Sequence, residues 1–321
     1  MRDIPRLEMS LLPTPLHRLN NLSAKLAADL YCKRDDLTAF AFGGNKTRKL
    51  DYLVMDALVK GYDSLITFGA VQSNWCRMTA TAGRVNGLDV FLLLSGEEPG
   101  KETANLLLDR LAGADIRFTA SEDRDDIIRE LNGMILDLEH HGRKPYYMPV
   151  GGSVARGSLG YIDAMAEILE YSEKSGVDFS EIILASGSAG TQAGLVAGQA
   201  VSGWKGRISG MAVSRSSSEQ EQKVFEIAKD TLDLIAYDYD EDSVRSLVHV
   251  DDNYLGEGYR KLTPACSGAI KDFVAYEGIF LDEVYSGKAA AGLIDYAGRG
   301  ELQGDGAVLF IHTGGNVQLF E

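Results

Sequence analysis

The chain of 321 residues contains little cysteine, little histidine and no long apolar run. Its three cysteines, Cys32, Cys76 and Cys266, are far apart and form no Cys-x-x-Cys pair, which argues against a disulfide framework and a zinc site. The five histidines form no helical metal-binding pattern, so we expect no metal. No apolar stretch approaches the ~20 residues that cross a bilayer, and the first residues lack the apolar core of a secretory signal.

Positive charge is also scarce, because 32 lysines and arginines stand against 47 aspartates and glutamates, a formal net charge of −15. Binding to nucleic acid or to an anionic membrane surface needs concentrated positive charge, so we expect neither partner. Hydrophobic residues make up 45% and charged residues 25%, as in globular proteins, and the length favours two domains at about 150 residues each. A cytoplasmic protein is therefore expected.

Short apolar segments alternate with segments of helical period along the chain. Leu50, Leu53, Val54 and Ala57 mark one face of a helix that Gly61 would end. Such alternation predicts an α/β protein with parallel sheets and helices on both faces. The acidic run at 238–242 and the pair Asp35-Asp36 are interpreted as solvated loop and strand-end or surface residues. Apolar strands are expected at 29–33, 65–68, 90–94, 116–119, 146–150, 182–185, 208–213 and 308–312.

The first candidate functional segment is rich in glycine and small hydroxyl residues. Residues 186–194 read SGSAGTQAG and lie between an expected strand and an expected helix. Free backbone N–H groups and the positive end of a helix dipole hold anions there, and Ser188 and Thr191 add hydroxyl donors. The segment matches neither a Walker loop nor a dinucleotide fingerprint. Phosphate binding and a tight turn that needs clearance both remain open.

The second segment, GGNKTRKL at 43–50, places Lys46, Arg48 and Lys49 at the start of a helix. The helix dipole disfavours cations at that end. The cluster makes sense if an anion binds nearby, or if one lysine is joined to an aldehyde as a Schiff base. A solvated basic turn is the alternative.

Two further segments end apolar runs with polar residues. Ser73 begins an expected helix, where it either receives a carboxylate or simply caps the helix. Tyr285-Ser286 and Thr313 follow apolar runs near the C-terminus, at the kind of position where open parallel sheets hold ligands. Packing and turn formation explain these residues equally well.

Taken in order, these segments resemble the family of D-cysteine desulfhydrase and 1-aminocyclopropane-1-carboxylate deaminase, which are fold type II pyridoxal-phosphate enzymes related to tryptophan synthase β. The resemblance runs from PTPL at 13–16 through KRDDL at 33–37 to the last strand, and 43–50 is its most specific motif. It implies pyridoxal 5'-phosphate as the cofactor, a small amino-acid substrate and a homodimer. It also implies two open parallel-sheet α/β domains with the cofactor in the cleft, a large domain of 1–47 and 155–321 and a small one of 48–154.

The resemblance also implies roles for individual residues. Lys46 would bind the cofactor aldehyde covalently, while Asn45 and Asn74 would steady the pyridoxal ring and its oxygen. Ser73 would meet the substrate carboxylate, together with Asn74, and Tyr259 and Tyr285 would face the substrate as catalytic residues. The phosphate would be held by Lys49, Gly187, Ser188, Ala189, Gly190 and Thr191.

Two positions separate the activities within this family. The deaminases carry Glu after the tyrosine equivalent to Tyr285 and Leu at the position of Thr313, whereas the desulfhydrases carry hydroxyl residues, as Ser286 and Thr313 are here. A carboxylate would keep the pyridine nitrogen protonated, while a serine leaves it unprotonated and favours expulsion of a β-substituent. We therefore expect a lyase that converts D-cysteine to pyruvate, ammonia and hydrogen sulfide.

Alternatives within the family are an L-cysteate sulfo-lyase and a 1-aminocyclopropane-1-carboxylate deaminase. A serine dehydratase or racemase, or a non-catalytic phosphate sensor, is also consistent with parts of the pattern. Two departures from the family bear on specificity. Trp75 stands where the family has His, on the substrate side, and Arg260-Lys261 replace a neutral pair. The two cations would suit a substrate with a second negative charge, such as cysteate, or form a surface pair without a role.

Overall fold

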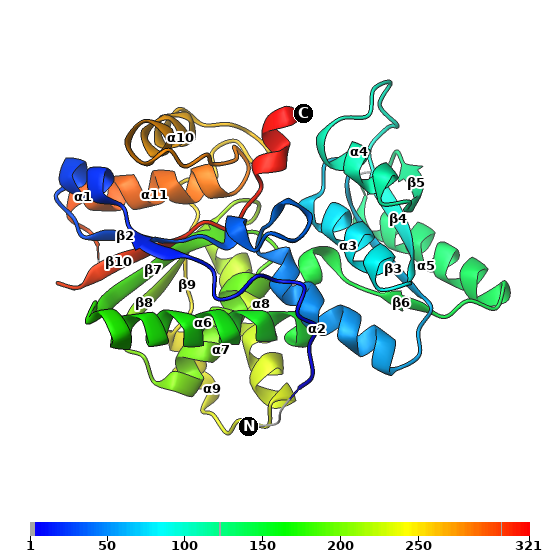
Figure 1. Ribbon diagram of the computed structural model, residues 1–321, viewed down its shortest axis with the longest axis horizontal. Coiled ribbons are helices and arrows are strands. Elements are labelled where there is room, and N and C mark those ends of the chain that lie inside the picture. The colour runs from blue at the N-terminus through cyan, green and yellow to red at the C-terminus, as the bar shows by residue number, and fades with distance from the viewer. Residues whose placement is uncertain (1–3, 122, 303) are drawn as a thin grey trace.

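Two sheets organise the chain, each surrounded by helices (Figure 1). The computed structural model describes residues 4–121, 123–302 and 304–321. The larger sheet has the strand order β1-β2-β10-β7-β8-β9, and the smaller has the order β5-β4-β3-β6. The larger comprises β1 (Leu16–Arg18), β2 (Leu30–Lys33), β7 (Phe179–Ser186), β8 (Arg207–Ala212), β9 (His249–Asp251) and β10 (Ala307–Ile311); the smaller comprises β3 (Ser64–Ala70), β4 (Asp89–Ser95), β5 (Asp115–Thr119) and β6 (Pro145–Tyr147).

Every described strand pair is parallel except β1 with β2, which are antiparallel. Parallel strands are covered on both faces, and the alternation of side chains explains their continuous apolar sequences. Along β7, Ile182 and Leu184 enter one core while Ile183 and Ala185 enter the core on the opposite face. In β3, Leu65 and Ile66 divide in the same way between two smaller cores.

Helices cover both faces of each sheet. On the larger sheet, α1, α10 and α11 lie on one face, and α6 to α9 lie on the other (Figure 1). On the smaller sheet, α5 contributes Ile127, Leu131 and Met134 to one core, and α2 and α3 pack on the opposite face. The helices are α1 (Asn20–Leu26), α2 (Lys46–Val59), α3 (Asn74–Val85), α4 (Ala104–Leu111), α5 (Arg124–His140), α6 (Ala155–Ser175), α7 (Gly190–Ser202), α8 (Ser217–Leu234), α9 (Glu241–Ser246), α10 (Pro264–Glu277) and α11 (Ser286–Arg299), with short 3-10 turns η1 (Asp35–Leu37), η2 (Phe40–Phe42), η3 (Val150–Gly152) and η4 (Asn316–Phe320).

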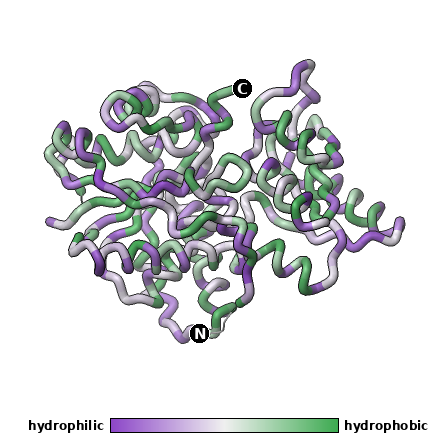
Figure 2. The backbone as a smooth tube through the Cα atoms, in the orientation of Figure 1, coloured by the Kyte–Doolittle hydropathy of each residue, from purple (hydrophilic) through white to green (hydrophobic). Residues whose placement is uncertain are grey.

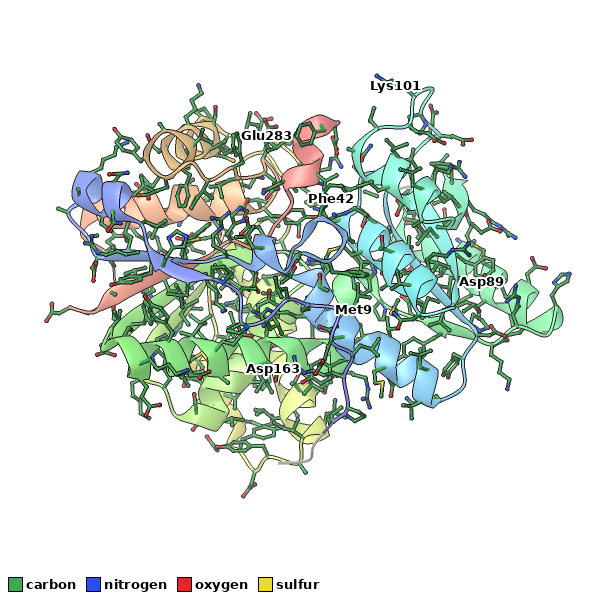
Figure 3. The ribbon with its side chains drawn as sticks, viewed as in Figure 1. Met9, Phe42, Asp89, Lys101, Asp163 and Glu283 are labelled. Carbon is green, nitrogen blue, oxygen red and sulfur yellow. The ribbon has the colours of Figure 1, made fainter. Side chains whose placement is uncertain are left out.

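The hydropathy of the backbone follows this layering (Figure 2). Hydrophobic stretches run along the central strands, whereas peripheral loops are largely hydrophilic. Lys101, for example, points outward from the tip of the loop before α4 (Figure 3). Within the described part of the chain, no helix combines the length and apolarity needed to cross a bilayer.

The α/β class with parallel sheets is confirmed, and several expected starts and ends of elements are found. Ser73 caps α3, as one of its two expected roles, by accepting a hydrogen bond from the Cys76 backbone N–H at 3.2 Å. The short antiparallel strand β1 and the helix α11 were not predicted, and the three residues of β1 are too few to show a period. The strand expected at 146–150 ends at Tyr147. The domain boundaries stay a prediction.

One interpretation from the sequence is confirmed only in part. Asp35 and Asp36 were expected to be strand-end or surface residues, and they do follow β2, but both side chains are buried. Asp35 is fully buried because it pairs with Arg48 of α2. The acidic run at 238–242 includes Asp240, which caps the short helix α9 by accepting a hydrogen bond from the backbone N–H of Ser243.

Candidate active site

A cavity of about 340 Å³ lies where the carboxyl ends of several strands converge. The ends of β3, β7 and β10 and the residue pair Ser214-Arg215 after β8 all contribute to its wall. This is the edge at which open parallel sheets bind ligands. The cavity wall contains most of the predicted site residues: Asn45, Lys46, Ser73, Asn74, Trp75, Gly187, Ser188, Ala189, Thr191, Tyr259, Tyr285 and Thr313.

Lys46 is the first residue of α2 and its amine lies in this cavity. Its Nζ donates a hydrogen bond to Asn45 Oδ1 at 2.8 Å, and Asn45 Nδ2 donates to Thr191 Oγ1 at 2.9 Å. Burial, helped by the positive charge of Arg77 and opposed by Asp282, lowers the pKa of Lys46 to about 8. Roughly a tenth to a fifth of this amine is therefore neutral between pH 7 and 7.4, far more than for a solvated lysine, and the neutral form is the one that acts as a nucleophile or a general base.

Lys49 lies directly behind the cavity wall, one helical turn after Lys46. Its Nζ donates to the Gly151 carbonyl at 3.0 Å and to Ser153 Oγ at 3.4 Å. No carboxylate in the described part of the chain pairs with this fully buried amine. Burial, and then the charge of Lys46, hold the pKa of Lys49 well below its usual value. A buried ammonium group without an acidic partner fits a site for an anion.

The beginning of α7 completes a cradle beside Lys49. The Gly190 backbone N–H donates to Ser153 Oγ at 3.2 Å, and Ser153 Oγ donates to Ser188 Oγ at 2.7 Å. A Cβ placed on Gly190 would lie 2.8 Å from Ser153 Oγ and 3.0 Å from Lys49 Nζ, so any larger residue would fill this space. Backbone N–H groups at a helix start, hydroxyl groups and one cation match the donors that a phosphate monoester needs. The described residues therefore fit the phosphate group of pyridoxal phosphate.

Ser153 and Gly151 belong to this cradle but were missed in the sequence. The signal was the run Gly151-Gly152-Ser153 after β6, in which both glycines adopt positive φ. Of the predicted phosphate residues, Lys49 and Gly190 lie just behind the cavity wall rather than on it.

Ser73, Asn74 and Trp75 form the wall on the side of the smaller sheet. Ser73 caps α3, so its hydroxyl lies beside the free backbone N–H groups of the first helical turn. Asn74 Oδ1 accepts a hydrogen bond from Asn105 Nδ2 at 3.1 Å, which fixes its amide. Trp75 is only 2% exposed, and its indole N–H donates to Thr67 Oγ1 at 2.8 Å. Trp75 thus contributes an apolar edge to the cavity and no free donor.

Arg77 is a second buried cation at the cavity wall. Its guanidinium donates to the Ala41 carbonyl and to Asn74 Oδ1, while Nε has no hydrogen-bond partner among the described residues. The carboxylate of Asp109 on α4 is fully buried nearby, and neither of its oxygens has a partner in the described structure. Burial raises the pKa of Asp109 to about 8, although Arg77 and Arg110 act in the opposite direction.

The substitution Asp109→Asn is expected to stabilise the protein increasingly as the pH rises. The folded-state pKa of about 8 lies above the ordinary value near 3.9, so folding is favoured while Asp109 is protonated and that advantage is lost as the pH rises toward 8. Asparagine carries no charge at any pH. At pH 8 the gain is on the order of 2–5 kcal/mol, and it vanishes near pH 4.

Thermal unfolding of both proteins between pH 4 and pH 9 measures this difference. Asp230→Asn, at an exposed position on α8, serves as the matched control and is expected to give no such trend. An Asp109→Asn effect that is the same at all pH values would show that Asp109 is already ionised in the folded protein.

Tyr259 and Tyr285 close the opposite side of the cavity. Their hydroxyl oxygens are 2.5 Å apart, and their rings meet edge to face. Burial, and then the neighbouring Tyr259, hold the pKa of Tyr285 well above its usual value, so its hydroxyl keeps its proton. The pair can therefore donate a proton into the cavity.

Ser286 and Thr313, the two predicted specificity positions, are placed differently. Thr313 lines the cavity, and its carbonyl accepts a hydrogen bond from the Asn45 N–H at 2.9 Å. Ser286 lies behind the wall as the first residue of α11. Its hydroxyl donates to Asp282 Oδ1 at 2.5 Å and accepts from the Asp282 N–H at 2.9 Å. Asp282, which sequence reasoning missed, also accepts from the N–H groups of Val284 and Tyr285 at the start of α11.

The predicted pair Arg260-Lys261 does not line the cavity. Arg260 Nη2 donates to both carboxylate oxygens of Glu321 at 2.9 and 2.6 Å, so the guanidinium is already paired with an acid. Gln318, in the same C-terminal segment, donates to the Gln72 carbonyl at 3.2 Å. The C-terminal segment thus connects the loop of Tyr259 with the loop before Ser73.

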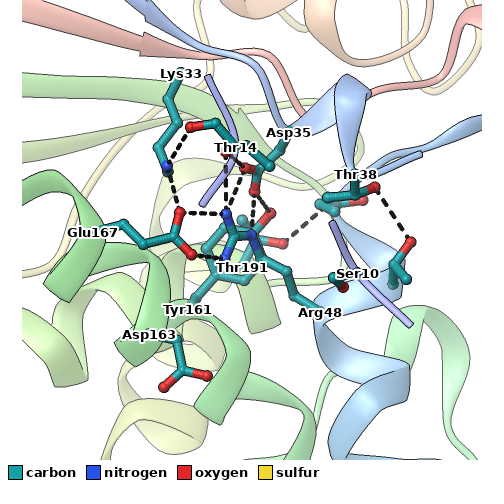
Figure 4. A network of polar contacts seen from close by, with 12 residues as sticks. Ser10, Thr14, Lys33, Asp35, Thr38, Arg48, Tyr161, Asp163, Glu167 and Thr191 are labelled. Carbon is teal, nitrogen blue, oxygen red and sulfur yellow. Dashed lines mark hydrogen bonds and ion pairs between the residues drawn. The ribbon is translucent and has the colours of Figure 1, made fainter. Parts of the chain in front are cut away.

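A network of buried charges holds the start of α2 in place (Figure 4). Arg48 donates two hydrogen bonds to Asp35, both at 2.9 Å, and two to Glu167, at 2.7 and 2.9 Å. Lys33 donates to Glu167 at 2.6 Å, and Tyr161 donates to Asp35 at 2.6 Å. Burial alone would raise the pKa of Asp35, but Arg48 and Lys33 lower it to about 2. Among the described residues, Arg48 is therefore the one member of the cluster of Lys46, Arg48 and Lys49 that forms ion pairs with the protein's own acids.

Comparison with known proteins agrees with this geometry. The family model for pyridoxal-phosphate dependent enzymes matches residues 7–314. D-cysteine desulfhydrase from Serratia proteamaculans is 40% identical over 325 residues, covering 100% of this chain and 96% of that protein. A Pyrococcus furiosus protein, provisionally assigned as a 1-aminocyclopropane-1-carboxylate deaminase, is 41% identical over 315 residues, covering 98% of this chain and 93% of that protein.

A crystal structure of a protein described as an ACC deaminase homologue superposes with a TM-score of 0.91 at 39% identity, covering 99% of this chain and 94% of that one. The lysine in the cavity, the phosphate cradle and these matches over nearly the full length all agree. The chain belongs to the family of pyridoxal-phosphate dependent enzymes.

Proposed function

We propose that this lyase catalyses α,β-elimination from a small β-substituted amino acid, with D-cysteine converted by water to pyruvate, ammonia and hydrogen sulfide. One observation carries the proposal. The low-pKa amine of Lys46 and the hydroxyl pair of Tyr259 and Tyr285 line the same cavity. An elimination needs both a base for the α-proton and a proton donor for the leaving group.

When bound, pyridoxal phosphate supplies an aldehyde that links to amines and an aromatic ring that draws off the negative charge developing at the substrate α-carbon. In our proposal Lys49, Ser153, Ser188 and the first N–H groups of α7 hold its phosphate. Asn45, fixed between Lys46 and Thr191, borders the ring site.

Lys46 Nζ accepts the α-proton in this proposal. Its pKa of about 8 is well below that of an ordinary lysine and gives a usable neutral fraction, and the hydrogen bond to Asn45 Oδ1 orients the amine within the cavity. The hydroxyl of Ser73 and the N–H groups at the start of α3 receive the substrate carboxylate, which is held by the positive end of the helix dipole. Two anchored ends fix the α-carbon near the base.

Tyr285 O–H, supported by Tyr259, donates a proton to the departing sulfur. The raised pKa of Tyr285 keeps this proton available at neutral pH. No acidic side chain lines the cavity among the described residues, so no carboxylate stands at the wall to keep a ring nitrogen protonated. This favours elimination over ring opening.

A panel of amino acids tests the proposal. Purified enzyme is given both enantiomers of cysteine, serine and cysteate and the cyclopropane amino acid, and sulfide, sulfite, pyruvate and 2-oxobutyrate are measured. We expect sulfide and pyruvate in equal amounts from D-cysteine. Sulfite from cysteate without sulfide from D-cysteine would show that cysteate, and not D-cysteine, is the substrate. Formation of 2-oxobutyrate from the cyclopropane amino acid would show that the enzyme is a deaminase, as the name of the Pyrococcus relative suggests.

A cytoplasmic homodimer is part of the proposal. Leu11, Leu37 and Phe42 expose apolar side chains around η1 and η2, and Leu11 N–H is bonded to Thr38 O beside them. Phe42 is 70% exposed and is marked in Figure 3. Burial of such side chains against a second copy of the chain would stabilise a dimer. Sedimentation velocity of the purified protein measures whether it is a dimer. The three buried free cysteines suit a reducing compartment.

A further inference from the structure

Lys288 is a buried cation to which the proposed mechanism gives no role. It is the third residue of α11, about one turn after Tyr285, and its side chain is fully buried. Its Nζ donates hydrogen bonds to the backbone carbonyl of Leu255 at 2.7 Å and to that of Gly258 at 2.9 Å. No carboxylate pairs with this amine within residues 4–121, 123–302 and 304–321. Since a buried amine is costly unless it is well bonded, these two carbonyl groups are what holds Lys288 in place.

Both carbonyl groups belong to the loop that carries Tyr259. Residues 252–263 connect β9 with α10 and form neither helix nor strand. On either side of Tyr259, Gly258 has a φ of 138° and Arg260 a φ of 60°. Positive φ is strained for a residue with a side chain, and it persists only where the surroundings hold the backbone. The loop around Tyr259 therefore depends on contacts with the rest of the chain.

The position of the Tyr259 ring depends on this loop, because burial does not fix it. Tyr259 is 42% exposed, yet its hydroxyl oxygen lies 2.5 Å from that of Tyr285. Tyr285 is placed by the start of α11, where its backbone N–H donates to Asp282 Oδ2 at 2.7 Å. Helix α11 thus carries one tyrosine directly and holds the loop of the other through Lys288.

A second contact beside Tyr259 is weaker. Arg260 is paired with Glu321, but both side chains are about one-third exposed, so water competes with this ion pair. Lys288 is removed from water, and its hydrogen bonds to the loop carbonyls come from a charged donor. Of the two contacts that flank Tyr259, the one made by Lys288 should hold the loop more firmly.

The beginning of the loop is fixed separately. Tyr254 is buried, and its hydroxyl donates to Asp295 Oδ2 of α11 at 2.6 Å. Loss of Lys288 should therefore loosen the part of the loop around Tyr259 without releasing its start.

We propose that Lys288 is a positioning residue, which holds the loop of Tyr259 against α11 so that the two tyrosine hydroxyls meet in the cavity. This inference rests on the proposed function, since the tyrosine pair matters for turnover only as the proton donor to the leaving group. It gives a task to the last residue of the segment at 284–288, which the sequence leaves without one.

Hydrogen exchange of the cofactor-loaded enzyme, followed by mass analysis of its peptides, measures how firmly the loop is held. The Lys261 N–H donates to the Gly258 carbonyl, the same group that Lys288 bonds. In Lys288→Met we expect residues 258–263 to exchange at least about tenfold faster, as the loss of a charge-assisted hydrogen bond implies, while α10 keeps its rate. Arg260→Gln, at the exposed ion pair, should change the rate by about twofold at most.

Kinetics provide the second measurement. In Lys288→Met, kcat for the best substrate of the panel should fall about tenfold and KM should stay within about threefold, because proton donation acts in the transition state. Lys271→Met, at an exposed position on α10, should leave both constants unchanged. In a Tyr259→Phe background, Lys288→Met should cause no further fall in kcat, because the two residues act on the same step.

Two results would overturn the proposal. One is an unchanged exchange rate of the loop in Lys288→Met. The other is a fall in kcat of equal size with and without the Tyr259 hydroxyl, which would mean that Lys288 supports a different part of the site. If Lys288→Met does not fold, Lys288→Gln, which keeps an N–H donor on a shorter side chain, is measured with the same expected directions.

The proposed function fails in a different way. Absence of pyruvate from every amino acid in the panel would contradict elimination, while faster exchange of residues 258–263 in Lys288→Met would still establish that Lys288 anchors the loop. Sulfide formation from cysteine together with unchanged exchange in Lys288→Met would leave elimination standing and refute the role of Lys288.

Discussion

Replacing Lys46 with alanine is expected to abolish the covalent attachment of the cofactor and to lower turnover by on the order of 10³–10⁴-fold or more. Lys46 is the cavity amine with a hydrogen bond to Asn45 and a pKa lowered to about 8, so its loss removes both the attachment point and the proposed base. Turnover is measured as pyruvate release from the best substrate of the panel. Lys60→Ala, at a half-exposed position just after the same helix, is the matched control.

The covalent attachment of the cofactor to Lys46 can be tested without measuring turnover. Borohydride reduction of the loaded enzyme, followed by peptide mass analysis, should find the cofactor on the peptide containing Lys46, and not on Lys49, which is buried behind the wall. Because the neutral amine is the reactive form, cofactor capture by the cofactor-free protein should speed up as the pH rises through about 8. Modification of another lysine, or undiminished activity in Lys46→Ala, would refute the assignment.

The second large effect is on stability. Arg48→Met removes the guanidinium between Asp35 and Glu167 and leaves two carboxylates buried with only Lys33 as a cation. Breaking a buried ion pair in this way costs about 3–5 kcal/mol, because the remaining charges cannot be solvated. Denaturation by urea at pH 7 measures the loss. Arg18→Met, which breaks an exposed ion pair with Asp29, should cost at most about 1 kcal/mol.

The loss in Arg48→Met should depend on pH. The pKa of Asp35 is lowered to about 2 in the folded protein, below the ordinary value near 3.9. The stability from this pairing is therefore complete above pH 4 and is lost as the pH falls through about 2, so the difference between the two proteins narrows in acid. A difference that is independent of pH, or smaller than that of Arg18→Met, would show that the network contributes little.

The amino-acid sequence by itself determined the class of fold and the main chemical groups. Continuous apolar strands such as β7 and β10 alternate with helices of clear period, and this local signal suffices to predict parallel sheets. Lys46 and the loop at 186–194 were found because small residues and misplaced cations are visible without coordinates. The resemblance to a known family then supplied the cofactor, which the family match confirms.

The tertiary structure alone decided which charges are balanced and which are left for a ligand. Arg48 and Lys49 are neighbouring cations in the sequence, yet the first pairs with Asp35 and Glu167, while the second, within the described part of the chain, bonds only to a carbonyl and a hydroxyl group. Likewise Arg260 is paired by Glu321 and Arg215 is not paired by an acid among the described residues. Such partners lie far apart in the chain, and no local pattern encodes their distance, so only the fold reveals the sites that attract anions.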